Sequence, residues 1–160
     1  MLDAPLSPSM QRAADLFAHQ FEAQGVPRIG ARILALLLLS SRPLHLDEIA
    51  RALRVSRASV STNTRVFLHL GLIEPAEVRG DRRRHFRLAE HAWENRLVAM
   101  AAVGGAFARG CAAARAVPDI PAAVAERLSI VEEFAAFLQE QSVELMVRWQ
   151  ARLAARGGAA

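Results

Sequence analysis

The sequence predicts a mainly helical protein with one small two-stranded β-hairpin. The 160 residues are rich in Ala, Leu and Arg, include neither Lys nor Tyr, and hold only nine Gly and seven Pro, a composition that favours helices over sheets. Apolar residues recur at helical spacing over most of the chain, and two short alternating segments flank a Gly-Asp pair near residue 80. We expect one core, with terminal helices that a second subunit covers.

The first predicted helix covers residues 9–24. Ser9 is available as its N-cap, and Gly25 can end it. A second helix opens at Pro27, whose missing N–H is not needed in a first turn, and runs to about Ser40. This second helix is apolar almost all round, which predicts burial on several sides. The first helix carries an apolar stripe of Leu16, Phe17 and Phe21.

Residues 44–70 predict two short helices that meet at a tight turn over residues 54–56. Asp47 and Glu48 favour the start of the first helix, because negative side chains suit the positive end of the helix dipole. Ser56 is a natural N-cap for the second, its hydroxyl accepting from the N–H of Ala58 or Ser59. Small Ala50 fits the helix crossing, and the apolar contacts between the helices are expected from Ile49, Leu53, Val55, Val60 and Phe67.

A β-hairpin follows over residues 72–88. Gly71 can end the preceding helix in a left-handed conformation, and the turn lies at Gly80 and Asp81. Pro75 places the first strand at an edge, since proline cannot donate a ladder hydrogen bond. Two further helices are predicted over residues 90–116 and 119–156.

This order of elements is that of a winged helix-turn-helix, in which the hairpin is the wing. We expect an N-terminal helix over residues 1–27 that supports dimerisation, a DNA-binding domain over 28–88, and a helical dimerisation region over 89–160. The last helix carries an apolar stripe that needs a partner surface. A fold in which both stripes pack on their own domain, leaving a monomer, is the alternative. The stripe consists of Phe134, Phe137, Leu138, Leu145, Trp149 and Leu153.

The positive charge is concentrated in the middle of the chain. The net charge is +4, yet residues 28–87 hold twelve Arg against five acids, so the rest of the chain is net acidic. Such asymmetry indicates a polyanionic partner or, equally on charge alone, a solvated basic face. Arg28 and Arg32 could reach phosphates or merely solvate the second helix.

The helix after Ser56 favours a nucleic acid as the partner. No carboxylate occurs between Ala50 and Leu72, and the free face of the helix offers hydrogen-bond donors that suit phosphates and the acceptor edges of bases. We expect DNA contacts from this helix and from the arginines at the wing tip. The candidate residues are Arg57, Ser59, Ser61, Thr62 and Arg65 on the helix and Asp81, Arg82, Arg83 and Arg84 on the wing.

Several strings together resemble the MarR-type winged-helix regulators. They are Leu46-Asp47-Glu48-Ile49-Ala50, Leu53-Arg54-Val55-Ser56, Leu70-Gly71-Leu72-Ile73-Glu74 and Gly80-Asp81-Arg82-Arg83. Within that family, residues 25–34 and the string Ser59-Val60-Ser61 resemble the GbsR-like branch. The resemblance covers roughly residues 25–88.

The resemblance implies a regulator of transcription, and we expect a repressor or a dual regulator. Its helix from Arg57 would be the recognition helix, and Asp81 would orient Arg83 into the minor groove of DNA. A two-fold dimer would read a pseudo-palindromic operator. The chain departs from the family pattern at Asn63 and Thr64, where members usually place more apolar residues.

The sequence gives no support for catalysis, a metal site or a cofactor. The five histidines (19, 45, 69, 85 and 91) lack ligand spacing, and no phosphate loop or nucleophile motif is present. Cys111 is the single cysteine of the sequence, which excludes an intrachain disulfide. We expect it to pack as a small hydrophobic residue or, alternatively, to sense oxidants. A small-molecule effector, if one exists, is expected near Trp93 and Phe107. Two other functions compete: a winged-helix adaptor that binds an acidic protein, and a ligand-binding helical module.

We expect a cytoplasmic, soluble protein. The N-terminus lacks the pattern of a signal peptide. The apolar run over residues 33–39 is too short to span a bilayer.

Overall fold

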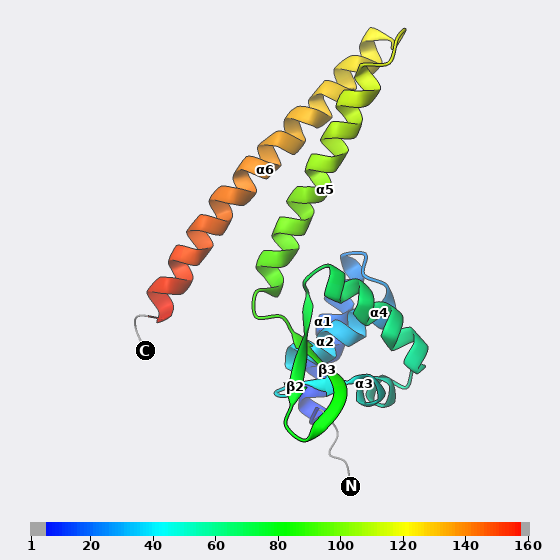
Figure 1. The fold of residues 1–160 in the computed structure, drawn as a ribbon, viewed down its shortest axis with the longest axis vertical. Helices are drawn as coiled ribbons and strands as arrows, with labels where there is room; N and C mark the ends of the chain where they lie inside the picture. The colour runs from blue at the N-terminus through cyan, green and yellow to red at the C-terminus, as the bar shows by residue number, and fades with distance from the viewer. Residues whose placement is uncertain (1–5, 158–160) are drawn as a thin grey trace. The chain divides into compact units, whose positions relative to one another are not determined.

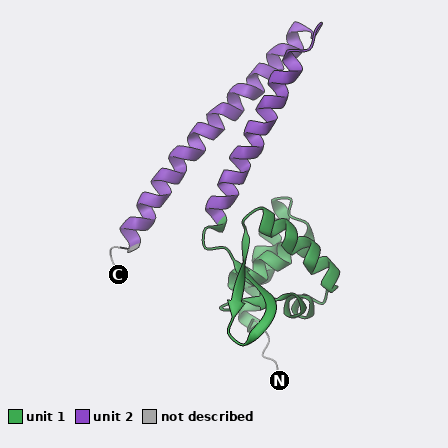
Figure 2. Ribbon diagram, in the orientation of Figure 1, with its two compact units in different colours: residues 1–92 green, residues 93–160 purple. Residues whose placement is uncertain are grey.

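The computed structural model describes residues 6–157, which fold into two compact units, residues 6–92 and 93–157 (Figure 2). The first unit holds four helices and a small sheet, and the second consists of a pair of long helices. This mostly helical arrangement with a small antiparallel sheet confirms the predicted fold class.

The first unit begins with α1 (Pro8–Ala23), which packs against α2 (Arg28–Leu39). The N-cap of α1 is Ser7, whose hydroxyl accepts from the N–H of Met10. The prediction of Ser9 as N-cap is therefore wrong by two residues. The physical reason is Pro8, which lacks an N–H and so fits the first position of a helix, leaving the preceding serine to cap it.

The helix α2 is the centre of the core, as its all-round apolar sequence predicts, and it crosses α4 (Arg57–His69) at close range. A Cβ at Gly30 would lie 2.8 Å from Oδ1 of Asn63 and 2.9 Å from Cζ of Phe67. Thr64 is buried, and its hydroxyl donates to the carbonyl of Ser61. The polar residues Asn63 and Thr64 are thus accommodated within α4, because Thr64 donates a hydrogen bond inside the helix and Asn63 lies beside Gly30.

The helix-turn-helix consists of α3 (Leu46–Leu53) and α4. Arg54 ends α3 in the left-handed conformation, with φ of 54°, and Ser56 caps α4 by accepting from the N–H of Ser59 at 3.1 Å. Ile49 and Val60 are fully buried between the helices. These features confirm the predicted turn, N-cap and core.

The sheet has three strands, where the sequence predicted two. The hairpin of β2 (Ile73–Val78) and β3 (Asp81–Leu88) is joined by β1 (Leu44–His45), and the strand order is β1-β3-β2. A strand of two residues is too short to show an alternating pattern in the sequence. It is defined only by its pairing with β3, in which Leu44 lies opposite Phe86 and His45 opposite His85. The strand β2, which contains Pro75, lies at an edge as predicted.

The second unit is a hairpin of α5 (Ala92–Arg115) and α6 (Ala122–Gly157). The two helices lie close together near the loop that joins them and separate toward their other ends (Figure 1). Arg115 pairs with Glu132 at 2.7 Å, and Nε1 of Trp149 donates to Glu94 at 2.8 Å. Cys111 is buried.

The helix α5 is, by length and composition alone, able to cross a membrane. Its most apolar window has a mean hydropathy of 1.6, and only 6% of that window is buried. The expectation based on residues 33–39 did not include α5, where Gly104 and Gly105 interrupt the run of apolar residues. An apolar helix that its own unit leaves exposed is equally what a helical interface between subunits requires.

Candidate nucleic-acid interface

The helix α4 presents a polar face away from the core. Val60, Thr64 and Phe67 turn inward. Of the sequence-predicted residues on the opposite face, Arg57, Thr62 and Arg65 are exposed, whereas Ser59 and Ser61 are half-buried. The hydroxyl of Ser59 also lies 2.8 Å from that of Ser56, within the N-cap. The exposed donors of α4 are therefore mainly the two arginines and the threonine.

The wing holds one of its arginines in a fixed direction. Gly80 adopts a left-handed conformation with φ of 82° and turns the chain into β3. Asp81 accepts from the backbone N–H of Arg83 at 2.9 Å and from its guanidinium through both carboxylate oxygens. The pairing of Asp81 with Arg83 that the resemblance implies is present, and we call it the wing clamp.

The wing clamp is charged under all ordinary conditions. Hydrogen bonds from the Arg83 side chain, and then from its backbone, hold the pKa of Asp81 far below its usual range. The same side-chain hydrogen bonds raise the pKa of Arg83. Arg82 and Arg84 are exposed beside the clamp, and Arg84 lies over the ring of Phe86 at 5.7 Å. The wing tip thus presents three arginines and only one carboxylate among residues 81–84.

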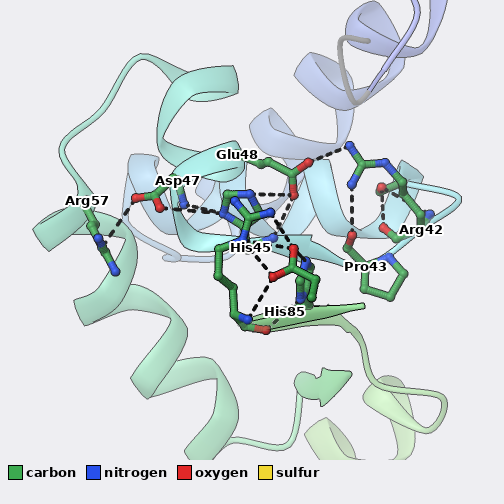
Figure 3. A network of polar contacts seen from close by, with 10 residues as sticks. Arg42, Pro43, His45, Asp47, Glu48, Arg57 and His85 are labelled. Carbon is green, nitrogen blue, oxygen red and sulfur yellow. Dashed lines mark hydrogen bonds and ion pairs between the residues drawn. The ribbon is translucent and has the colours of Figure 1, made fainter. Parts of the chain in front are cut away.

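A polar network around the start of α3 links α4 to the wing (Figure 3). Asp47 pairs with Arg57 at 3.5 Å, and Glu48 pairs with Arg42 at 2.8 Å. Glu48 also accepts from the backbone N–H of His45 at 3.0 Å, which completes a capping box. Burial would raise the pKa of Glu48, but the hydrogen bonds from Arg42 and His45 outweigh it and lower the pKa.

The charges of Asp47 and Glu48 act on the wing clamp as well. Both carboxylates contribute, after Asp81 itself, to the raised pKa of Arg83. Arg57 pairs with Asp47 in the first turn of α3, and Arg83 is connected to the N-cap of α3 through Asp81, His85 and His45. The start of α3 thus brings together one arginine of the helix and one of the wing.

Sequence reasoning missed two residues of this network, His45 and His85. Both imidazoles are buried, His45 as the N-cap of α3 and His85 as its cross-strand neighbour on β3. The glutamate three residues after His45 was the available signal, because it forms half of a capping box. Histidine is not among the usual capping residues, so the sequence alone did not predict the capping box of His45 and Glu48.

The remaining candidates lie outside this network. Trp93 lines an apolar groove of about 350 Å³ with Trp149, and Phe107 is not part of that lining. The effector expectation near Trp93 and Phe107 thus joins residues that the structure does not place in one groove. Arg28 is exposed, and Arg32 lines a separate pocket with Arg51 and Arg54. Within residues 6–157, no group of three or more His, Cys, Asp or Glu side chains is placed to hold a metal ion.

Comparisons with known proteins agree with this geometry. Residues 24–84 match the model of the MarR family. The chain is 29% identical over 150 residues to the HTH-type transcriptional regulator MmpR5 of Mycobacterium tuberculosis. The aligned region covers 91% of this chain and 89% of that protein. A crystal structure described as a transcriptional regulator aligns with a TM-score of 0.75 at 28% identity, covering 90% of this chain and 99% of the other.

Proposed function

We propose that this chain, whose residues 24–84 match the model of the MarR family, is a sequence-specific regulator of transcription that binds double-stranded DNA as a homodimer. One observation carries the proposal. Arg57, the first residue of α4, pairs with Asp47 at the start of α3, and the wing clamp is joined to the same start of α3 through His85 and His45, so a single duplex can contact both.

In this proposal α4 enters the major groove, where Arg57, Thr62 and Arg65 reach phosphates and acceptor edges of bases. Ser59 and Ser61 contribute less, because both are half-buried. The wing follows the backbone to the adjacent minor groove. There Arg83, directed by Asp81, enters a narrow and electronegative space, with Arg82 and Arg84 beside it.

The second unit supports the proposed homodimer. Its two helices diverge and leave an apolar groove of about 570 Å³ between them. Large apolar side chains are exposed along both helices, and together they form a larger apolar surface than a soluble monomer normally exposes. A second copy of the chain can cover both the groove and these side chains. They include Val98, Met100, Val103, Phe107, Ile130, Phe134, Phe137, Val143 and Val147.

A two-fold dimer places two copies of α4 about one turn of DNA apart and so favours a pseudo-palindromic operator. We further propose that the protein is a cytoplasmic repressor, which acts by occupying that operator, and that it belongs to the GbsR-like branch. The branch assignment rests on residues 25–34 and on Ser59, Val60 and Ser61. The apolar character of α5 is, in this proposal, that of a dimer helix.

The decisive test is selection of DNA by the full-length protein. Duplexes are selected from a random-sequence library, and fragments from upstream of the protein's own gene are tested in parallel by gel shift. We expect a selected site with two-fold symmetry and, by sedimentation, a particle of twice the 17.4 kDa of one chain. Failure to enrich any sequence, with binding to acidic proteins instead, would favour the adaptor function.

A further inference from the structure

Two buried histidines connect the wing to the start of α3. His45 on β1 and His85 on β3 are cross-strand partners, and their rings meet edge to face with centroids 5.4 Å apart. Each of the two residues is less than 5% exposed. A buried polar ring must satisfy its nitrogens within the protein, so the contacts of these two rings define where their protons lie.

The contacts of His45 fix its neutral form. Its Nδ1 accepts from the backbone N–H of Asp47 at 3.2 Å and therefore carries no proton. The proton of the neutral ring is then on Nε2, which faces a carboxylate oxygen of Glu48 at 3.5 Å. Burial, as the main cause, lowers the pKa of His45. His45 thus acts as a neutral cap of α3.

The contacts of His85 lead to the opposite result. Its Nδ1 lies 2.8 Å from the backbone carbonyl of Arg83, and since a carbonyl only accepts, Nδ1 must donate. In the neutral ring Nε2 then has a lone pair and no proton. That lone pair faces a carboxylate oxygen of Asp81 at 3.4 Å, so two acceptors oppose each other. A second proton, on Nε2, turns this contact into a charge-assisted hydrogen bond.

The carboxylate that His85 faces is the one that holds Arg83. We propose that His85 is a positioning residue for the wing arginine: a proton on its Nε2 fixes Asp81, and Asp81 fixes Arg83 in the direction that contacts DNA. The contact with DNA rests on the proposed function, whereas the effect on Arg83 does not. Binding of a duplex should accordingly be tighter at pH 6 than at pH 8.

The charges around His85 come from three elements. On β3 itself they are Asp81, which favours the charged ring, and Arg83, whose guanidinium shares that carboxylate and opposes it. Across β1 and α3 they are His45, with Glu48 and Asp47 beyond it. On β2 the residue opposite His85 is Ala76, and the buried residues of α2, which packs on β3, are all apolar. The ring therefore faces one cation and a nearby group of carboxylates (Figure 3).

The variant His85→Asn separates the two roles of the ring. The Asn amide can still donate to the carbonyl of Arg83, as Nδ1 does, but it leaves nothing opposite Asp81. At pH 6 we expect His85→Asn to bind a duplex selected by the wild-type protein about fivefold more weakly, with little difference at pH 8. The matched control is His19→Asn, which removes an exposed histidine of α1 and should change neither value.

A double-mutant cycle distinguishes positioning from a general loss of structure. If His85 acts through Arg83, His85→Asn should cost nothing further in an Arg83→Ala background. A loss of equal size in both backgrounds would overturn the proposal. If His85→Asn does not fold, Asp81→Asn provides the same test, because it keeps the histidine and removes the carboxylate. Binding of the selected duplex by Asp81→Asn should then lose the dependence on pH that the wild-type protein shows.

A measurement without DNA separates this proposal from the proposed function. In ¹⁵N-labelled full-length protein, the Nε–H resonance of Arg83 should shift with pH in step with protonation of Nε2 of His85, and this shift should vanish in His85→Asn. If the Arg83 resonance shows the same dependence on pH in the wild-type protein and in His85→Asn, the positioning role is refuted even if DNA binds. If no duplex binds, the regulator function fails, and the Arg83 resonance alone decides the role of His85.

Discussion

Nε of Arg57 lies 3.5 Å from a carboxylate oxygen of Asp47, so the first residue of α4 is paired with the first turn of α3. Both side chains remain substantially exposed, which makes the pair weak in free energy. Phosphate groups of a bound duplex can therefore compete for Arg57. Asp47 is also a negative charge close to the place where we expect the DNA backbone.

The variant Asp47→Asn should bind a selected duplex more tightly, by about two- to fivefold, because it frees Arg57 and removes repulsion of phosphate. The free energy of unfolding should fall by about 0.3–1 kcal/mol, since α3 loses a negative charge at its first turn. Fluorescence anisotropy and urea denaturation measure the two effects. Glu126→Gln, in exposed α6, is the charge-matched control. Weaker binding of Asp47→Asn would show that the carboxylate positions Arg57 instead.

Gly30→Ala should destabilise the first unit by about 1–3 kcal/mol, the usual cost of forcing an extra group into a packed core. The added Cβ would meet Asn63 and Phe67, of which Phe67 is buried and Asn63 donates to the carbonyl of Ser59. Gly110→Ala in α5, where nothing lies near the new Cβ, should instead be neutral or stabilising. Urea denaturation at one fixed protein concentration compares the variants, and equal effects of both would contradict the close crossing of α2 and α4.

Features that depend on neighbouring residues in the chain could be predicted from the sequence, whereas features that depend on distant residues could not. Ser56 and Gly71 reveal local chemistry, namely an N-cap and a left-handed helix end, and both were predicted. Gly30 gives no local signal, because its role depends on a residue more than thirty positions away. The same holds for His45 and His85, which become neighbours only when β1 pairs with β3.

The candidate site was predictable in its residue types and not in its connections. An acid-free helix and an arginine-rich turn pointed to α4 and the wing. The pairing of Arg57 with Asp47 crosses from one helix to the next, and periodicity within a helix carries no information about such pairs. The half-burial of Ser59 and Ser61 likewise follows from helix packing.

Arg54→Gly should stabilise the protein by about 0.5–1 kcal/mol. Arg54 ends α3 with φ of 54° and ψ of 45°, a conformation that costs a residue with a Cβ more than it costs glycine. Arg51→Gly, one turn earlier within α3, should lose about 1 kcal/mol, because glycine is unfavourable inside a helix. Thermal or urea unfolding that ranks the two variants the other way would refute the role of Arg54 as a strained helix end.

Acidification should destabilise the first unit through His45. Burial lowers the pKa of this ring below its ordinary value of 6.5, so the unfolded chain takes up a proton more readily than the folded one. The free energy of unfolding should therefore fall as the pH drops below about 6.5 and should level off below the folded pKa. Asp81 and Glu48, whose pKa values are lowered, stay charged throughout this range.

The variant His45→Asn tests this assignment. Asparagine still accepts from the N–H of Asp47 as an N-cap but takes up no proton. Its unfolding free energy should decline less steeply than that of the wild-type protein between pH 7 and pH 5, as urea denaturation at several pH values can show. Parallel curves would assign the pH dependence to other residues.

The salt dependence of DNA binding tests most directly whether α4 and the wing clamp contact one duplex. For Arg65→Ala, Arg83→Ala and the double variant, the logarithm of the binding constant for a selected duplex is plotted against that of the salt concentration. Because the proposed dimer brings two copies of each arginine to the duplex, each substitution should lower the slope by about 1.8, additively, while Arg127→Ala in α6 leaves it unchanged. Slopes that stay at the wild-type value in the double variant would contradict the claim.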